Sequence, residues 1–194
     1  SIIDLAGGHQ PIVSPGGELS AVVNGEIYNY IELRREYVAR GGVEPLTRSD
    51  SESVLQVYAA EGVQGLCHLN GMFALALHDR ARRRVVLARD RLGIKPLYVY
   101  CDATRVAFGS ELKALLPLLP APPALDADAI AQFLENEFAS GEGTVFAGIQ
   151  RVPPGHALVI DPALNVQRER YWSLQQLRTL DLDMAQAQEA FTAL

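Results

Sequence analysis

The sequence predicts an α+β fold in which stacked antiparallel sheets are covered by helices. Short apolar strand patterns dominate the middle of the chain, at residues 72–78, 85–88, 97–101 and 106–110. Helical patterns come in pairs before and after this middle part. Neighbouring strand patterns are joined by short turns rather than by crossover helices, which argues against a regular βαβ alternation.

The remaining elements follow from local periodicity and from turn residues. Further strand patterns occupy residues 1–5, 12–13, 19–23, 157–160 and 166–171. Helical patterns occupy residues 30–40, 52–61, 63–69, 111–116 and 184–194, with another that opens at residue 126. Hairpin turns are expected at residues 15–17, 80–84, 102–104 and 161–163, where Gly, Pro, Asp or clustered Arg residues interrupt the apolar runs.

Several helix ends carry a recognisable signal. The first long helix should stop at Gly41, since glycine is the usual residue just past a helix end. Ser49 or Asp50 is expected to cap the second helix, and Asp126 to cap a later one with its carboxylate. Pro117 is expected to end the helix that begins at residue 111, because proline interrupts a helix interior.

Composition places the chain among ordinary globular proteins. Its 194 residues suffice for one substantial domain, and 48% of them are hydrophobic. A net charge of −6 gives no electrostatic reason to expect nucleic acid or an anionic membrane as partner. Two cysteines and no signal-like start favour a cytoplasmic location. Both ends interrupt a pattern, so we expect the sequence to be a piece of a longer chain.

Three familiar kinds of site are not supported. The histidines (His9, His68, His78 and His156) are scattered without ligand spacing, so no metal site is expected. Residues 140–144 lack the lysine and the incoming strand of a phosphate loop. Cys67 precedes His68 in a helical pattern, where adjacent side chains point about 100° apart and would not form a nucleophile–base pair.

The sequence Asn24-Gly25 allows two interpretations. It follows the apolar run 19–23 and could form a tight turn, because both residues tolerate positive φ. Alternatively, it exposes a side-chain amide and a backbone N–H beside the carboxylate of Glu26. Such a group could hold an amide substrate and its developing oxyanion.

A series of longer motifs appears in a fixed order along the chain. They are residues 1–4 (Ser-Ile-Ile-Asp), 24–29 (Asn-Gly-Glu-Ile-Tyr-Asn), 49–52 (Ser-Asp-Ser-Glu), 71–74 (Gly-Met-Phe-Ala), 89–98 and 109–113. This series resembles the glutaminase domain of glutamine-hydrolysing asparagine synthetases, which are amidotransferases with an N-terminal nucleophile. Residues 146–172 are similar to the segment that closes that domain.

The resemblance implies an αββα sandwich of two antiparallel sheets covered by helices, truncated at its N-terminus. Residues 1–172 would be an incomplete glutaminase domain, and 173–194 a linker with the start of a synthetase domain. Asn24 and the Gly25 N–H would form the oxyanion hole, while Glu26 and Asp50 would hold the α-amino group of glutamine. The implied substrate-binding residues are Ser1, Ile2, Ile3, Asn24, Gly25, Glu26 and Asp50.

The nucleophilic cysteine would lie upstream of Ser1, with its own α-amino group as base. This chain alone is therefore expected to be inactive and to need no cofactor or metal. ATP and Mg²⁺ are expected in a synthetase domain of the same polypeptide, which is the implied partner together with glutamine; a homodimer is compatible with this.

Residues 90–98 are expected to serve strand–turn packing. Two alternatives stay open, namely another carboxylate or sugar acceptor and a non-catalytic glutamine-binding module.

Overall fold

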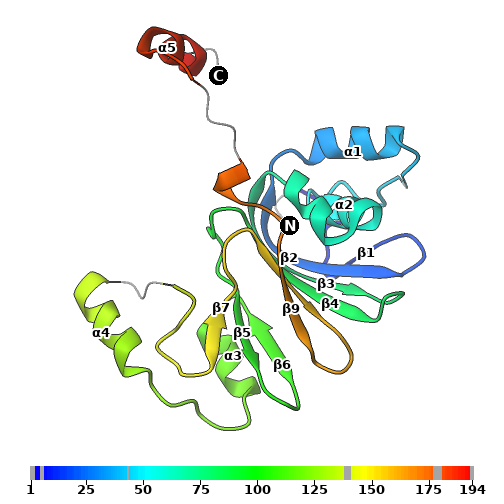
Figure 1. Cartoon of the computed structure of the whole chain (residues 1–194). Helices are drawn as coiled ribbons and strands as arrows, with labels where there is room; N and C mark the ends of the chain where they lie inside the picture. Colours follow the sequence, from blue (N-terminus) through cyan, green and yellow to red (C-terminus); the bar gives the residue numbers. More distant parts are fainter. Residues whose placement is uncertain (1–2, 5–6, 43, 138–140, 177–180, 193–194) are drawn as a thin grey trace.

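A computed structural model describes residues 3–4, 7–42, 44–137, 141–176 and 181–192, and it contains two antiparallel sheets (Figure 1). The larger sheet has the strand order β1-β2-β3-β4-β8-β9 and the smaller one β6-β5-β7. The larger sheet comprises β1 (Ile12–Val13), β2 (Leu19–Ile27), β3 (Gly71–Asp79), β4 (Arg84–Arg89), β8 (His156–Ile160) and β9 (Val166–Arg170). The smaller comprises β5 (Tyr98–Cys101), β6 (Val106–Gly109) and β7 (Ile149–Arg151).

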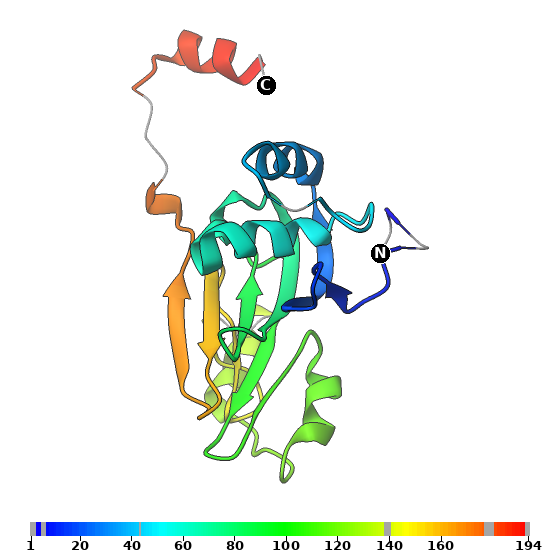
Figure 2. The same cartoon turned by 90° about the vertical axis from the view of Figure 1, so that its right-hand side faces the viewer.

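Helices flank these sheets. They are α1 (Tyr30–Ala39), α2 (Glu52–Glu61), α3 (Leu112–Leu115), α4 (Ala127–Asn136) and α5 (Met184–Thr192), with 3₁₀ turns η1 (Gly62–His68), η2 (Leu116–Leu118) and η3 (Leu174–Gln176). Helices α1 and α2 cover one face of the six-stranded sheet, whereas α3 packs with the smaller sheet (Figures 1 and 2). Helix α5 stands apart, and none of its residues is buried. The α+β class and the two-sheet arrangement are thus confirmed.

Strand β3 shows how the two sheets are held together. Side chains alternate across a strand, so Phe73, Leu75 and Leu77 join the core beneath α1 and α2. Ala74 joins the other core, which Leu87, Leu158 and Ile160 share with Val99 of the smaller sheet and with Leu97, the residue just before β5. The face of Phe73, Leu75 and Leu77 is fully buried, whereas on the other face only Ala74 is buried, Met72 and Ala76 are half-buried and His78 is exposed. The burial on both faces that the nearly continuous apolar pattern predicted is therefore only partly confirmed.

The smaller sheet covers only part of the face it packs against. Its contacts centre on β4 and β8, through the side chains of Leu87 and Leu158. On β2 the corresponding face carries Val22, which is 43% exposed, and Asn24, which is also exposed. The face of the six-stranded sheet is consequently left uncovered at β2.

The turn expected at Asn24-Gly25 is absent, and that interpretation is wrong. Strand β2 continues to Ile27, with Asn24 opposite Ala74 and Gly25 opposite Phe73 in the ladder with β3. Gly25 adopts a φ of 151°, and a Cβ there would lie 1.9 Å from the carbonyl oxygen of Met72. The glycine is needed for close approach of two strands rather than for a chain reversal.

The expectations about helix ends have mixed outcomes, and the cap of α2 is wrong. Neither Ser49 nor Asp50 is the N-cap of α2; that residue is Ser51, whose side chain makes no capping hydrogen bond. The α-helix α3 does end before Pro117, at Leu115, but the chain continues as the 3₁₀ turn η2, with proline within the first two residues of that turn. Proline fits there since its missing N–H would have no partner in a first turn. The Asp126 cap is confirmed, with its Oδ1 accepting from the N–H of Ala129 at 3.0 Å.

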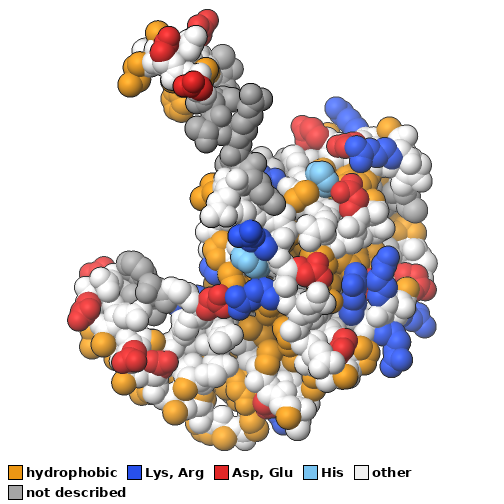
Figure 3. Space-filling model, viewed as in Figure 1, with side chains coloured by type: hydrophobic (Ala, Val, Ile, Leu, Met, Phe, Trp, Pro, Cys, Tyr) orange, Lys and Arg blue, Asp and Glu red, His pale blue; other side chains and the backbone are white. Residues whose placement is uncertain are grey.

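The remaining differences are small. Strand β7 was not foreseen. Of the strand expected at residues 1–5, only Ile3 and Asp4 lie within the described residues, and neither is in a strand. The Arg-rich turn is confirmed at residues 80–83. It joins β3 to β4, and basic side chains gather at the right-hand side of Figure 3, where this end of the large sheet lies.

Candidate functional site

The side chain of Asn24 lies on the uncovered face of the six-stranded sheet, at β2. A pocket of about 250 Å³ lies there between the two sheets. Its lining includes Gln10, Val22 and Asn24 from the β1–β2 side, and Phe108 and Ser110 from β6 and the residue beyond it. An amide side chain therefore faces a small, mostly apolar hollow, which is a common setting for a ligand contact.

The backbone of Gly25 points to the outer edge of the same strand. In antiparallel strands, N–H groups of successive residues point to opposite sides. The N–H of Tyr28 donates to Asn70 on the β3 side at 2.7 Å. The N–H groups of Val23 and Ile27 instead donate to the side chains of Gln10 and Asp50. Gly25 lies midway between these two residues, so its N–H faces the outer edge as theirs do.

Asp50 is anchored at the end of β2. Its side chain is buried, and its Oδ2 accepts from the N–H of Ile27 at 2.8 Å. That contact is one residue beyond Glu26, which is half-buried. The carboxylate of Asp50 therefore lies next to the segment that carries Asn24 and Gly25.

Sequence reasoning assigned no contact to two polar side chains, Gln10 and Glu52. Gln10 holds the backbone of Val23 at both its N–H and its carbonyl, at 2.6 and 2.8 Å. Glu52, which is buried, accepts from the N–H groups of Leu46 and Thr47 and so shapes the loop before α2. Gln10 lies in a loop, where no sequence pattern indicates a contact. Glu52 lies in the first turn of α2, and the helical pattern does not reveal that its side chain binds the preceding loop.

Of the implied residues at the chain start, only Ile3 is described, and it does not line this pocket. Ser1 and Ile2 lie outside the described residues. Ile3 is 45% exposed and lines a different pocket with Tyr30, Ile31 and Arg48. Asp4 accepts from the N–H of Arg48 at 2.9 Å, which holds this segment against the loop before α2.

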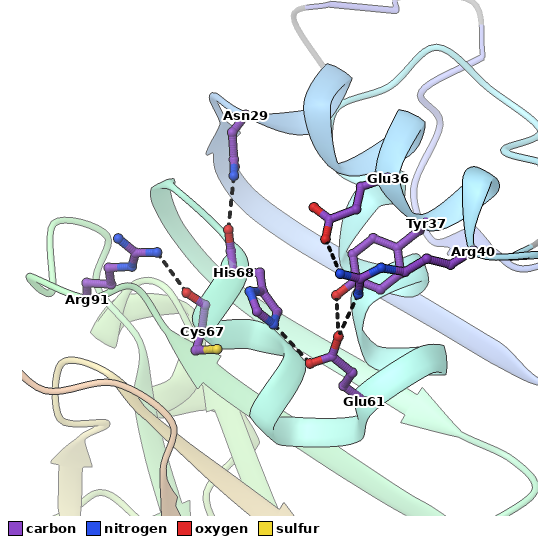
Figure 4. Close-up of polar contacts among 8 residues, drawn as sticks. All are labelled: Asn29, Glu36, Tyr37, Arg40, Glu61, Cys67, His68 and Arg91. Carbon is purple, nitrogen blue, oxygen red and sulfur yellow. Dashed lines mark hydrogen bonds and ion pairs between the residues drawn. The ribbon is translucent and has the colours of Figure 1, made fainter. Parts of the chain in front are cut away.

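Cys67 and His68 form no nucleophile–base pair, as expected (Figure 4). The His68 ring contacts Glu61 at 2.9 Å, and Glu61 in turn accepts from the Tyr37 hydroxyl. Arg91 donates to the backbone carbonyl of Cys67 rather than to its sulfur. Burial and the charge of Glu61 raise the pKa of the Cys67 thiol, and desolvation and Asp102 do the same for Cys101. Neither thiol is activated.

The loop after β4 is organised by a single carboxylate. Asp90 is fully buried. Its oxygens accept four backbone N–H groups, those of Phe73, Leu92, Ile94 and Lys95, at 2.9 to 3.2 Å. Arg89 closes the loop by donating to the carbonyls of Gly93 and Lys95. These bonds confirm strand–turn packing as the role of this motif.

Across the described ranges, no group of three or more His, Cys, Asp or Glu side chains is placed to hold a metal ion. No helix in that part of the chain is long and apolar enough to span a bilayer.

Comparison with known proteins places these features in context. Residues 1–172 match the family described as glutamine amidotransferase domain. An asparagine synthetase [glutamine-hydrolyzing] 3 from Bacillus subtilis is 34% identical over 185 residues, covering 93% of this chain and 30% of that protein. A protein named amidase chry2 from Gibberella zeae is 32% identical over 176 residues, covering 90% of this chain and 25% of that protein.

Solved structures agree on the fold. A glutamine phosphoribosylpyrophosphate amidotransferase from B. subtilis superposes with a TM-score of 0.56 at 19% identity. The match covers 84% of this chain and 32% of that one. The chain thus spans less than a third of the length of each of these relatives, and its two-sheet fold is that of amidotransferases.

Proposed function

Because the chain belongs to the glutamine amidotransferase domain family, we propose that it holds the side-chain amide of glutamine within a glutamine-hydrolysing asparagine synthetase. Residues 1–172 would form the glutaminase part, and 173–194 a linker and the beginning of the synthetase part. The whole protein would then transfer ammonia from glutamine to aspartate. ATP and Mg²⁺ would belong to the synthetase part, where they would activate the aspartate carboxylate.

The observation that carries this proposal is the pairing of two hydrogen-bond donors on β2. The Asn24 side chain faces the pocket, and the N–H of Gly25 faces the strand edge beside it. When a thiolate attacks the glutamine amide carbon, the carbonyl oxygen acquires negative charge. Donors fixed in advance at that oxygen stabilise the transition state, and removing one costs roughly 10²- to 10³-fold in kcat.

Acidic groups at the end of β2 suit the other end of the substrate. We assign the α-ammonium group of glutamine to Glu26 and Asp50, because charge-assisted hydrogen bonds hold an ammonium group well. The nucleophile would be the N-terminal cysteine of the whole protein. Its α-amino group takes the thiol proton as the sulfur bonds to the amide carbon, and it passes that proton to the departing ammonia. Water then hydrolyses the thioester and releases glutamate and the thiol.

A second candidate function keeps the glutaminase and changes the acceptor. The relative from Gibberella zeae is named an amidase rather than a synthetase, yet its identity to this chain is close to that of the asparagine synthetase. We therefore keep an acceptor other than aspartate as the second candidate. Offering the whole protein aspartate and other carboxylates, with ATP and glutamine, and identifying the amidated product would decide between them.

The glutaminase assignment is tested by Asn24→Ala in the whole protein. Glutamine-dependent ammonia release should fall about 10²- to 10³-fold, whereas ATP-dependent synthesis from free ammonia should be kept. Asn136→Ala, at the exposed end of α4, is the matched control and should change neither rate. Unchanged glutamine hydrolysis by Asn24→Ala would remove Asn24 from the oxyanion hole.

A further inference from the structure

We propose that Gln10 is a positioning residue for glutamine hydrolysis, because its side chain fixes the strand segment that carries Asn24 and Gly25. This role rests on the proposed function. It concerns a residue outside the set that the sequence motifs implied. Gln10 would act through Asn24 and the N–H of Gly25, without itself contacting the reacting atoms.

The side chain of Gln10 replaces a missing partner in the ladder. In the register of β1 and β2, Ile12 pairs with Ala21 and Val13 with Ser20, so the next position of this parity places residue 10 opposite Val23. The ladder with β2 begins only at Ile12, so residue 10 lies before the first pair of β1. The amide of Gln10 makes the bonds that a strand backbone would make, accepting from the Val23 N–H at 2.6 Å and donating to its carbonyl at 2.8 Å.

This contact is one of two that hold the outer edge of β2 on either side of Gly25. Gln10 binds Val23, two residues before the glycine, and Asp50 binds Ile27, two residues after it. Between them lies the N–H that we assign to the oxyanion hole. An edge with neither contact could shift, and misplacing a catalytic group by about 1 Å can cost on the order of 10²-fold in rate.

Because Gln10 is exposed, the effect of replacing it can be distinguished from a loss of core packing. Gln10 is an exposed residue that borders the Asn24 pocket, so truncating it leaves no cavity in the interior. Its amide supplies a donor and an acceptor together. A glutamate at this position would keep the acceptor for Val23 N–H but would place a negative charge against the Val23 carbonyl.

The test uses the whole protein with Gln10→Ala and Gln10→Glu, and with Gln64→Ala as an exposed control. Both Gln10 variants should lower kcat for glutamine hydrolysis about 10- to 100-fold, with KM for glutamine changed less than about threefold. Synthesis from free ammonia and the melting temperature should stay at the wild-type values. The Gln64 variant should match wild type throughout.

A double variant distinguishes positioning from a general effect. If Gln10 acts through Asn24, adding Gln10→Ala to Asn24→Ala should lower kcat by clearly less than it does in the wild-type background. Full additivity, or an unchanged kcat in both single variants while wild type hydrolyses glutamine, overturns the role of Gln10 and leaves the glutaminase in place. A wild-type protein that releases no ammonia from glutamine overturns the proposed function itself.

Discussion

Replacing Gly25 with alanine tests the close approach of β2 and β3. The new Cβ would lie 1.9 Å from the carbonyl oxygen of Met72 and 2.7 Å from the Cα of Phe73, both of them backbone atoms that cannot rotate away. To restore an ordinary contact at 3.4 Å, the strands would have to part by about 1.5 Å. Alanine would also have to adopt a φ near the 151° of Gly25, which L-residues rarely do.

The magnitude follows from these two costs. Overpacking costs about 1–3 kcal/mol and an unfavourable backbone conformation a similar amount, so we expect a loss near 3 kcal/mol. For a chain of this size, that corresponds to a melting temperature about 6–12 °C lower. Thermal unfolding followed by circular dichroism measures it. Gly143→Ala is the control, because a Cβ there meets nothing within 4 Å. Equal shifts for Gly25→Ala and Gly143→Ala would refute the reasoning.

Two further predictions concern buried carboxylates. Asp90→Asn should lower the free energy of unfolding in urea by about 2–4 kcal/mol, because one side-chain oxygen becomes an NH₂ group facing backbone donors; a change below about 0.5 kcal/mol would contradict this. Burial raises the pKa of the Asp79 carboxyl, but the Arg82 N–H, the Tyr58 hydroxyl and the Arg82 side chain outweigh it and hold that pKa below its ordinary 3.8. The stabilisation is therefore complete at neutral pH and is lost as pH falls below about 4; Asp79→Asn should flatten this acid limb in unfolding curves, and an unaltered limb would exclude Asp79 as its source.

Local periodicity was enough to predict most of the elements. The helices now called α1 and α2 have apolar residues at helical spacing, and the first is followed by Gly41 at a φ of 84°. The hairpins have turn residues between apolar runs, so neither element needs information from elsewhere in the chain. Strand β7 has only three residues and is defined by its pairing with β5, which no local pattern reveals.

The site was harder to predict because its contacts are long-range. A local rule assigned Asn24-Gly25 to a turn, but nine residue pairs between β2 and β3 hold that segment in a ladder. A local rule likewise gave Asp50 to a helix cap, whereas its side chain reaches Ile27, 23 residues earlier. Gln10 reaches Val23 from a loop that carries no signal for such a contact. Motif resemblance named Asn24, Gly25 and Asp50, but only the fold reveals how their surroundings are held.

The six-stranded sheet ends in two edges that resist joining another sheet. Strand β1 is only two residues long and is preceded by Pro11, which cannot donate to an incoming strand. At the opposite edge, β9 carries Arg168, Glu169 and Arg170 in succession, and these charges would have to be desolvated in any edge-to-edge contact. Pro11 thus hinders pairing with an incoming strand, while the side chain of its neighbour Gln10 holds Val23 on the inner side. Selection against aggregation and selection for catalysis would then act on one short stretch of the chain.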